Sequence, residues 1–340
     1  MSVILEAKNV SKRFKIRGSG LRGKYMHAIW QCNLRINSNQ PAITAIAGES
    51  GSGKTTLAKL LLGFHTPTAG EVLFHGKNLK RLTSNETKHY RMEVQAIFQD
   101  PFEVYNPFYK IDHILEMPLK KFGIANKKNE INTRIIDTLE AVGLRPEETL
   151  GRFPHQLSGG QRQRVMIARA LLLKPKVILA DEPVSMIDAS LRATILENLL
   201  YLNKKIGISL LYITHDLTTA YQLCDNITIM YKGHIVEIGD CESVIKNPKH
   251  PYTQLLIRSI PVPDPKVSWG EKEDQYSSEE QESETGCPFS SLCPKTMDSC
   301  KQELPDLYRL DKDQGCRCFL FKDNPIEPDM GTFLESGEVT

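Results

Sequence analysis

The chain has 340 residues, enough to bury the core of one large domain or of a large domain and a small one. Its 43 lysines and arginines nearly balance 41 aspartates and glutamates, so no overall charge would attract nucleic acid or an anionic membrane. No segment approaches the ~18 consecutive apolar residues of a membrane span, and the first residues lack the apolar core of a secretory signal. The sequence therefore predicts a chain that stays in the cytoplasm and binds no nucleic acid.

The first 260 residues are predicted to form one compact α/β unit. Three short, almost wholly apolar runs are typical of strands covered on both faces of a parallel sheet. They are residues 42–47, 177–180 and 209–213. Residues 70–77 and 227–239 alternate around turn residues and predict two antiparallel hairpins.

A helical insert interrupts this α/β pattern. Between about 103 and 156 apolar residues such as Ile131, Ile135 and Leu139 recur at helical spacing, so we expect a helical subdomain within about 100–170.

Beyond residue 260 the composition changes. Residues 261–286 are rich in proline and acidic side chains, which predicts a solvated linker, and residues 287–340 are predicted to form a cysteine-rich C-terminal extension.

Residues 48–55, GESGSGKT, fit the G-x-x-x-x-G-K-S/T pattern of a phosphate-binding loop. A predicted strand enters the motif and a predicted helix, TLAKLLLG, leaves it. Glycines let backbone N–H groups close around phosphate oxygens, Lys54 reaches the outer phosphates, and Thr55 can bind Mg²⁺. A glycine-rich turn that binds nothing is the alternative. The predicted binding residues are Gly48, Glu49, Ser50, Gly51, Ser52, Gly53, Lys54, Thr55 and Thr56.

The run VILADEP places two carboxylates at the end of a predicted buried strand. Asp181 can hold Mg²⁺ through water, and Glu182 has a carboxylate free to orient an attacking water. By itself the pair could equally be a polar strand end.

A second candidate phosphate site lies at residues 157–172, LSGGQRQRVMIARALL. Ser158 and two glycines are predicted to open a helix whose N-terminal amides can cradle a phosphate. With these motifs in this order, the sequence resembles the ATP-binding cassette (ABC) family, whose signature is LSGGQ. The resemblance implies a P-loop NTPase fold, with a mostly parallel core sheet, an antiparallel β-subdomain and the helical insert. It also implies that ATP and Mg²⁺ bind, with contacts from Ser158, Gly159, Gly160 and Gln161.

The resemblance assigns roles to further residues. Gln99 in IFQDP matches a glutamine that contacts Mg²⁺ and the attacking water, and His215 in YITHD matches a histidine that contacts the γ-phosphate. Asp188 in SMID matches the aspartate of the following loop, although Met186-Ile187 replace the usual Ala-Leu. The implied catalytic set is Glu182, His215 and Gln99, and the implied Mg²⁺ ligands are Thr55, Gln99 and Asp181.

Phe14 in SKRF stands where the family has an aromatic residue that stacks on adenine. A core phenylalanine is the alternative.

The family resemblance also implies that this chain is one of two ATPase subunits that hydrolysis requires. In the family, ATP is held between the phosphate loop of one subunit and the signature helix of another, and this chain contains only one cassette. The implied partners are a second ABC ATPase, two transmembrane permease subunits and an extracytoplasmic solute-binding protein. The implied location is the cytoplasmic face of the membrane.

A finer resemblance is to ATPase subunits of oligopeptide and dipeptide importers, whose relatives also take nickel complexes or oligosaccharides. The segments HPYTQLLIRSIPVPDP and GCPFSSLCPKTMDSC carry it, and LSGGQRQR resembles the second of two sister ATPases. A soluble, ATP-switched regulatory scaffold is the alternative from another class. An exporter ATPase is disfavoured because exporters rarely have this tail.

Eight cysteines in a reducing compartment are better explained as thiols or metal ligands than as disulfides. Those in the tail are spaced C-x5-C-x6-C-x17-C, with Cys316 nearby, and this spacing suits zinc, an iron–sulfur cluster or free thiols. The importer resemblance suggests a four-iron four-sulfur cluster. Its ligands would be Cys287, Cys293, Cys300 and Cys318.

Overall fold

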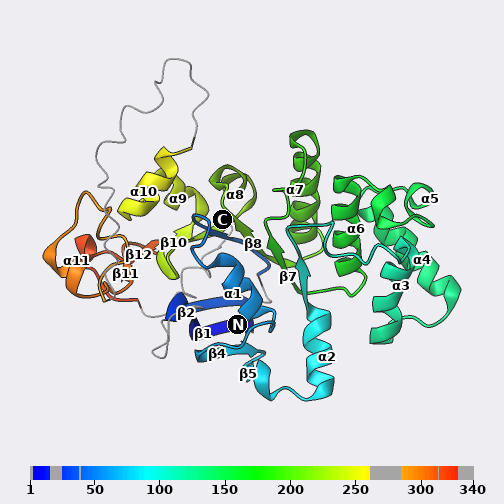
Figure 1. Ribbon diagram of the computed structural model, residues 1–340, viewed down its shortest axis with the longest axis horizontal. Coiled ribbons are helices and arrows are strands. Elements are labelled where there is room, and N and C mark those ends of the chain that lie inside the picture. The colour runs from blue at the N-terminus through cyan, green and yellow to red at the C-terminus, as the bar shows by residue number, and fades with distance from the viewer. Residues whose placement is uncertain (1–2, 16–24, 38–39, 261–284, 313, 328–340) are drawn as a thin grey trace. The chain divides into compact units, whose positions relative to one another are not determined.

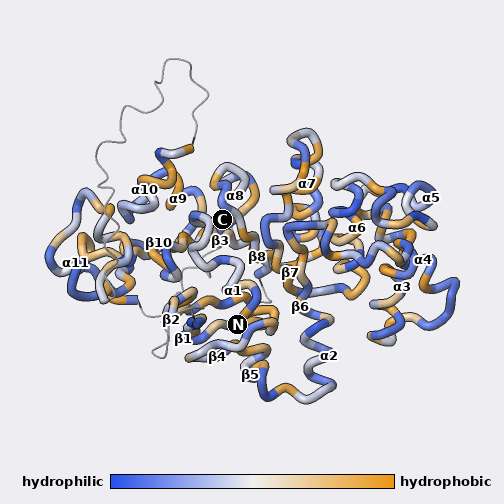
Figure 2. Tube along the Cα trace, viewed as in Figure 1, coloured by the Kyte–Doolittle hydropathy of each residue, from blue (hydrophilic) through white to orange (hydrophobic). Residues whose placement is uncertain are grey.

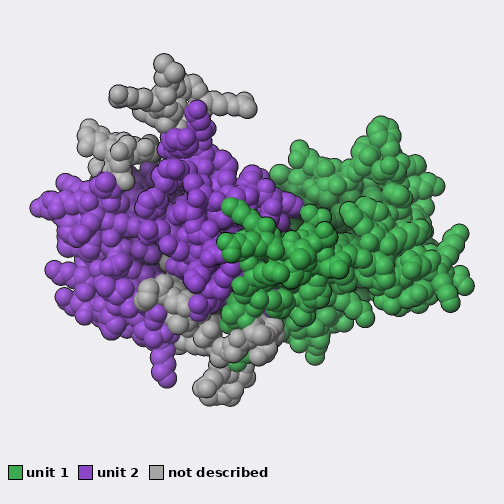
Figure 3. All heavy atoms as spheres, turned by 90° about the horizontal axis from the view of Figure 1, so that it is seen from below, with its two compact units in different colours: residues 1–3, 37–43, 74–213 green, residues 4–36, 44–73, 214–340 purple. Residues whose placement is uncertain are grey.

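The computed structural model describes residues 3–15, 25–37, 40–260, 285–312 and 314–327. The predicted linker at 261–286 therefore lies almost wholly outside the described residues. Internal contacts divide the chain into two compact units (Figure 3). Unit 1 contains residues 1–3, 37–43 and 74–213, and unit 2 contains residues 4–36, 44–73 and 214–340.

Unit 1 is built on three parallel strands (Figure 1). β7 (Val177–Asp181) pairs with β6 (Val94–Ile97) on one side and with β8 (Ser209–Thr214) on the other. β7 and β8 are almost wholly buried and nearly free of charge, as expected for strands covered on both faces. Figure 2 shows hydrophobic stretches along both. The predicted strands at 177–180 and 209–213 are thus confirmed to within one residue.

One α-helix of unit 1 precedes β6, and the others fall between these strands. Those between β6 and β7 lie together in Figure 1, where α3, α4 and α6 contact one another. Ile131, Ile135 and Leu139 form the buried stripe of α4, which matches the predicted helical spacing. The α-helices are α2 (Ser84–Glu93), α3 (Ile111–Phe122), α4 (Lys128–Ala141), α5 (Pro146–Thr149), α6 (Gly159–Leu171) and α7 (Ala189–Lys204). Shorter elements are β5 (Lys77–Asn78), η1 (Leu79–Arg81) and η2 (Pro154–Gln156).

Unit 2 contains two groups of strands. β2 (Tyr25–Asn37), β1 (Val3–Lys15) and β4 (Ala69–Phe74) are neighbours in one sheet. β3 (Ile43–Ala47) pairs in parallel with β9 (Asn226–Tyr231), which pairs antiparallel with β10 (His234–Asp240). The hairpin predicted at 227–239 is therefore confirmed, whereas the two long strands β1 and β2 are findings of the structure.

The C-terminal tail adds strands to unit 2. β12 (Gln314–Cys316) pairs antiparallel with β10, and β11 (Tyr308–Arg309) pairs with β12. The tail thereby extends the strand group that includes β3. The helices of unit 2 are α1 (Lys54–Leu61), α8 (Leu217–Leu223), α9 (Cys241–Lys246), α10 (Pro251–Arg258), α11 (Asp298–Gln302) and the short η4 (Phe319–Phe321).

Within the described ranges, every helix is either too short or too polar to cross a lipid bilayer.

Candidate nucleotide-binding and catalytic site

The loop between β3 and α1 has a backbone that only glycine permits at two positions. A Cβ on Gly48 would lie 2.2 Å from the carbonyl oxygen of Met230, and one on Gly53 would lie 2.4 Å from that of Ala28. Both glycines have positive φ, 148° and 106°, as does Gly51 at 82°. The chain therefore curls tightly between a buried strand and a helix N-terminus, which is the geometry that presents backbone N–H groups to a phosphate.

Lys54 is the first residue of α1, and its side chain is only 5% exposed. Its ammonium donates to the carbonyl oxygens of Gly48 and Glu49, both at 2.7 Å, and lies 3.4 Å from Ser52 Oγ. The positive charge is thus held within the loop that carries the motif. Thr55 and Thr56 follow in the first turn of α1, where Thr55 is exposed.

A tyrosine from α10 supports this loop. The hydroxyl of Tyr252 accepts a hydrogen bond from the Glu49 N–H at 3.0 Å, and Tyr252 is fully buried. Its ring packs against those of Tyr231 and Phe289, with centroids 4.5 and 5.6 Å away. No sequence motif points to Tyr252, because motif spacing carries no signal for a partner 203 residues away.

Glu237 anchors α10 to the rest of unit 2. Its buried carboxylate accepts hydrogen bonds from the N–H groups of Lys249 and His250 and from the Gln314 side chain. Burial raises the pKa of Glu237, while these hydrogen bonds offset part of the effect. Strand β10, helix α10 and the tail are therefore joined at one carboxylate.

In unit 1, two predicted catalytic residues are in contact. The Gln99 amide donates to Glu182 Oε2 at 3.0 Å, although the residues are 83 positions apart. Asp181 ends β7, and Glu182 has a positive φ of 45°, with its N–H bonded to the Ile213 carbonyl at 2.9 Å. A non-glycine residue in this conformation is strained, and such strain clusters at functional sites.

The signature motif forms the start of α6. Ser158 caps the helix by accepting from the Gln161 N–H at 3.2 Å, while Gln161 accepts from the Ser158 N–H at 2.9 Å. A Cβ on Gly160 would lie 2.8 Å from Leu191 Cδ1, so the helix approaches α7 closely. The Gln99 segment also contacts α6, since the Phe98 N–H lies 3.1 Å from Met166 Sδ.

Three further predicted residues lie at element ends or at partly exposed positions. Asp188 is exposed and precedes the first residue of α7 in unit 1. His215 is exposed between β8 and α8 in unit 2. Phe14 lies on β1, half-buried, with its ring edge-on to His65 at 5.6 Å and the Lys12 ammonium 5.0 Å above it. Its partial exposure fits a stacking residue better than a core one.

The predicted site residues thus fall into two sets. Unit 2 contains Phe14, residues 48–56 and His215. Unit 1 contains Gln99, residues 158–161, Asp181, Glu182 and Asp188.

The tail brings its cysteines near one another. The Cys287 N–H bonds to the Cys300 carbonyl at 2.7 Å. Burial, with smaller effects from the neighbouring Cys300, Cys318 and Cys293, raises the pKa of the Cys287 thiol to about 12. Cys316 is buried in β12. Cys32, Cys224 and Cys241 are buried in unit 2, where a free thiol packs as a small apolar side chain.

Comparison with known proteins agrees with this geometry. Residues 31–185 match the family described as ABC transporter, and residues 236–300 match the oligopeptide/dipeptide transporter C-terminal region. In the dimeric structure of the ATP-binding cassette MJ0796 bound to ADP and Pi, the fold recurs with a TM-score of 0.62 and 30% identity, covering 70% of this chain and 99% of that one. Fold and loop together define a P-loop NTPase of the ABC class, with mixed sheets.

Proteins of similar sequence identify a narrower branch of this class. The chain is 38% identical to the oligopeptide transport ATP-binding protein OppF of Salmonella typhimurium, over 84% of this chain and 85% of that protein. It is 37% identical to a putative oligopeptide transport ATP-binding protein, YkfD, of Bacillus subtilis, over 82% of this chain and 85% of that protein. The chain belongs to the oligopeptide/dipeptide branch of the ABC transporter ATP-binding proteins.

Proposed function

We propose that this chain is the ATP-hydrolysing subunit that energises import of peptides across the cytoplasmic membrane. The observation that carries the proposal is the glycine-constrained loop with Lys54 held inside it, in a chain whose relatives are named for oligopeptide transport. The C-terminal region shared with oligopeptide and dipeptide transporters favours peptides over oligosaccharides.

The proposed roles follow the chemistry of each side chain. The amides of residues 48–56 and Lys54 bind the phosphates, and Phe14 stacks on adenine. Glu182 orients the attacking water as general base and Gln99, its hydrogen-bond partner, positions the same water. His215 contacts the γ-phosphate. Thr55, Gln99 and Asp181 would offer oxygen donors to Mg²⁺, directly or through water, and the ion would supply positive charge against the charge that develops on the phosphate.

The active assembly is proposed to contain two cassettes. The signature residues 158–161 and Asp188 of one subunit would complete the ATP site of the other, so that ATP binding favours the closed dimer and hydrolysis reopens it. The related MJ0796 cassette was solved as a dimer. We expect a non-identical sister ATPase, two transmembrane permease subunits, an extracytoplasmic solute-binding protein, and a peripheral position on the cytoplasmic face.

The tail is proposed to hold a four-iron four-sulfur cluster on Cys287, Cys293, Cys300 and Cys318. Thiols that are near enough to raise one another's pKa suit a metal group, since metal binding replaces their protons and removes the repulsion between thiolates. The cluster would crosslink the tail, in whose described residues Phe289, Leu307 and Tyr308 are the only buried hydrophobic side chains besides cysteines. Zinc at the same cysteines is the alternative.

Co-purification tests the proposed assembly. The chain, tagged and expressed with its neighbouring genes, should be extracted in mild detergent together with two multispanning subunits and a second ATPase. Its ATPase activity should rise on adding binding protein and peptide, and not on adding oligosaccharide. A chain that hydrolyses ATP but brings no membrane subunit would support the regulatory scaffold instead.

Metal analysis tests the tail. After anaerobic purification, we expect about four irons and four acid-labile sulfides per chain, lost in a variant with Cys300→Ser. Zinc without sulfide would reject the cluster.

A further inference from the structure

Two histidines and one buried glutamate, none of them assigned to ATP, meet in unit 1. Glu93 ends α2 and His89 lies one turn before it, at the i,i+4 spacing that places both side chains on one face. His75 comes from the turn after β4. One nitrogen from each histidine and a carboxylate oxygen of Glu93 all lie within 4.8 Å of one another.

The contacts have the dimensions of a metal site. Glu93 Oε2 lies 2.8 Å from His75 Nε2, and Oε1 lies 3.2 Å from His89 Nε2. Ligands at the usual zinc distance of about 2.1 Å in a tetrahedron are separated by about 3.4 Å. Small movements of two partly exposed imidazoles would therefore let a dication replace the proton shared in each contact.

Packing holds the ligands in place. The ring of Phe74, which is 4% exposed, lies edge-on to His75 at 4.4 Å and to His89 at 6.0 Å. Glu93 itself is only 8% exposed on its side chain. A metal would thus enter a partly formed site rather than order three mobile side chains.

One group competes with a metal for this carboxylate. The Lys176 ammonium lies 2.6 Å from Glu93 Oε1. Burial would raise the pKa of Glu93, but hydrogen bonds from Lys176 and His75 outweigh it and lower the pKa, so Glu93 is a carboxylate at neutral pH. The Lys176 ammonium by itself balances the charge of the Glu93 carboxylate. An ion pair would therefore form here without the two imidazoles of His75 and His89.

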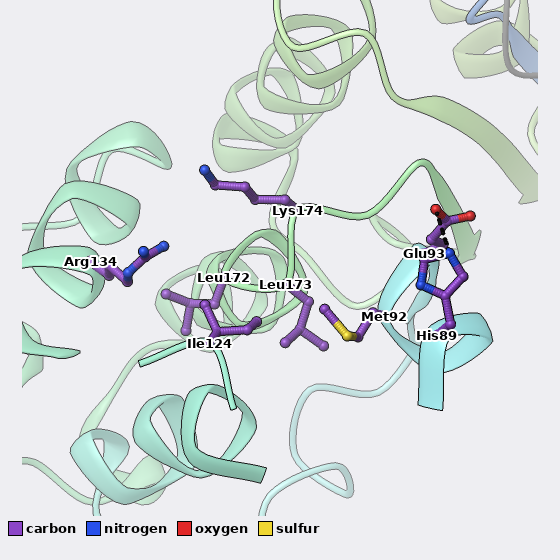
Figure 4. A pocket seen from close by; sticks show the side chains of 8 residues that line it. All are labelled: His89, Met92, Glu93, Ile124, Arg134, Leu172, Leu173 and Lys174. Atoms are coloured by element: carbon purple, nitrogen blue, oxygen red, sulfur yellow. Dashed lines mark ion pairs between the residues drawn. The ribbon is translucent and has the colours of Figure 1, made fainter. Parts of the chain in front are cut away.

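The cluster also has an accessible side. His89 and Glu93 line a pocket of about 350 Å³ together with Met92, Leu173 and Lys174 (Figure 4). A metal bound there would keep one coordination position for water at the pocket mouth.

We propose that His75, His89 and Glu93 form a binding site for a first-row transition-metal dication of the zinc type. Two imidazoles and one carboxylate are the donor set that such ions favour over Mg²⁺ or Ca²⁺. The ion would link the turn after β4 to the end of α2, and so stabilise unit 1.

Zinc binding to the full-length, anaerobically purified protein tests the site. Equilibrium dialysis against Zn²⁺ should show one site that H75Q and H89Q each weaken by at least about tenfold. Because tail cysteines that hold no cluster would also take up zinc, affinities are compared among variants that share an intact tail. H155Q, at an exposed histidine outside the cluster, is the matched control and should leave the affinity unchanged.

Substitution of Lys176 gives a second measurement, in which the zinc affinity should change in the opposite direction. K176Q removes the competing ammonium and should tighten zinc binding severalfold, and saturating zinc should raise the unfolding temperature of wild type by more than that of H75Q. Equal zinc affinities in wild type, H75Q and H89Q would overturn the proposal. So would weaker binding in K176Q, since the three residues would then form only an ion-pair cluster with Lys176.

Discussion

The two units hold their functional residues by different means. In unit 2 the phosphate loop is constrained by main-chain contacts, because Gly48 and Gly53 approach backbone carbonyls too closely for any side chain. In unit 1 the hydrogen bond between Gln99 and Glu182 joins two side chains, and Glu182 takes a strained φ. Substitutions in unit 2 should therefore affect nucleotide affinity first, and substitutions in unit 1 should affect turnover.

Glu182→Gln is expected to have the largest effect. The amide keeps the shape of the side chain but cannot accept a proton from water, so kcat should fall by about 10²–10⁴-fold while ATP affinity is retained. Phosphate release by the purified complex, with nucleotide binding measured separately, checks this. Glu197→Gln, at an exposed position on α7, is the control. Turnover at the wild-type rate in Glu182→Gln would contradict the catalytic assignment.

Gly53→Ala should instead weaken nucleotide binding strongly. Its Cβ would lie 2.4 Å from a backbone carbonyl at a φ of 106°, so we expect a loss of about 3 kcal/mol in ATP affinity. Gly51→Ala is the matched control, because φ is also positive but nothing lies within 4 Å of the added Cβ. Its cost should be about 1 kcal/mol. Equal losses in the two variants would show that backbone strain, and not close approach, constrains the loop.

The buried side chain of His250 should make the stability of the folded chain depend on pH. Burial lowers the pKa of His250 to about 3, and its Nδ1 accepts from the Tyr252 N–H at 3.1 Å. Below its ordinary pKa of about 6.5 the unfolded chain binds a proton that the folded chain refuses, so stability falls as pH falls toward 3. The loss should be about 1.5 kcal/mol between pH 6.5 and 5.

His250→Asn keeps a helix-capping acceptor but cannot titrate, so urea unfolding midpoints should depend less on pH in the variant than in wild type. The pKa of His234, which burial lowers to about 4, contributes equally to both proteins and cancels in this comparison. Parallel pH profiles would mean that His250 is not buried as the neutral form.

Local sequence signals predicted some elements closely. β3, β7 and β8 are short, apolar and buried on both faces, so composition alone indicates them. The start of α6 follows from the reciprocal cap between Ser158 and Gln161. β1 and β2 escaped prediction because each has 13 residues of mixed polarity with no regular alternation.

Contacts between distant segments left no such signal. The three residues of β12 show no pattern, yet they extend the strand group that carries the phosphate loop. Motifs identified Gln99 and Glu182 separately, but spacing cannot show that they touch. The same holds for Tyr252, whose hydroxyl reaches the loop from α10.

Tyr252→Phe should therefore have the smallest effect, and it tests the comparison between the two units most specifically. It keeps the ring between Tyr231 and Phe289 and removes only the acceptor of the Glu49 N–H. Such a hydrogen bond is worth about 1 kcal/mol, so KM for ATP should rise about fivefold. Because Gln99 and Glu182 belong to the other unit, kcat should stay within about twofold of wild type.

Tyr201→Phe, at an exposed tyrosine on α7, controls for loss of a hydroxyl as such. Phe289→Leu distinguishes the contribution of the Tyr252 ring from that of its hydroxyl. It weakens the aromatic packing while leaving the contact with Glu49 available. A purely structural role for Tyr252 would lower the unfolding midpoint equally in Tyr252→Phe and Phe289→Leu and leave KM unchanged. A rise in KM confined to Tyr252→Phe would instead mean that the tail-linked helix α10 positions the Glu49 amide of the phosphate loop. In that case α10 and the nucleotide loop act as one element, although Glu49 and Tyr252 lie 203 residues apart.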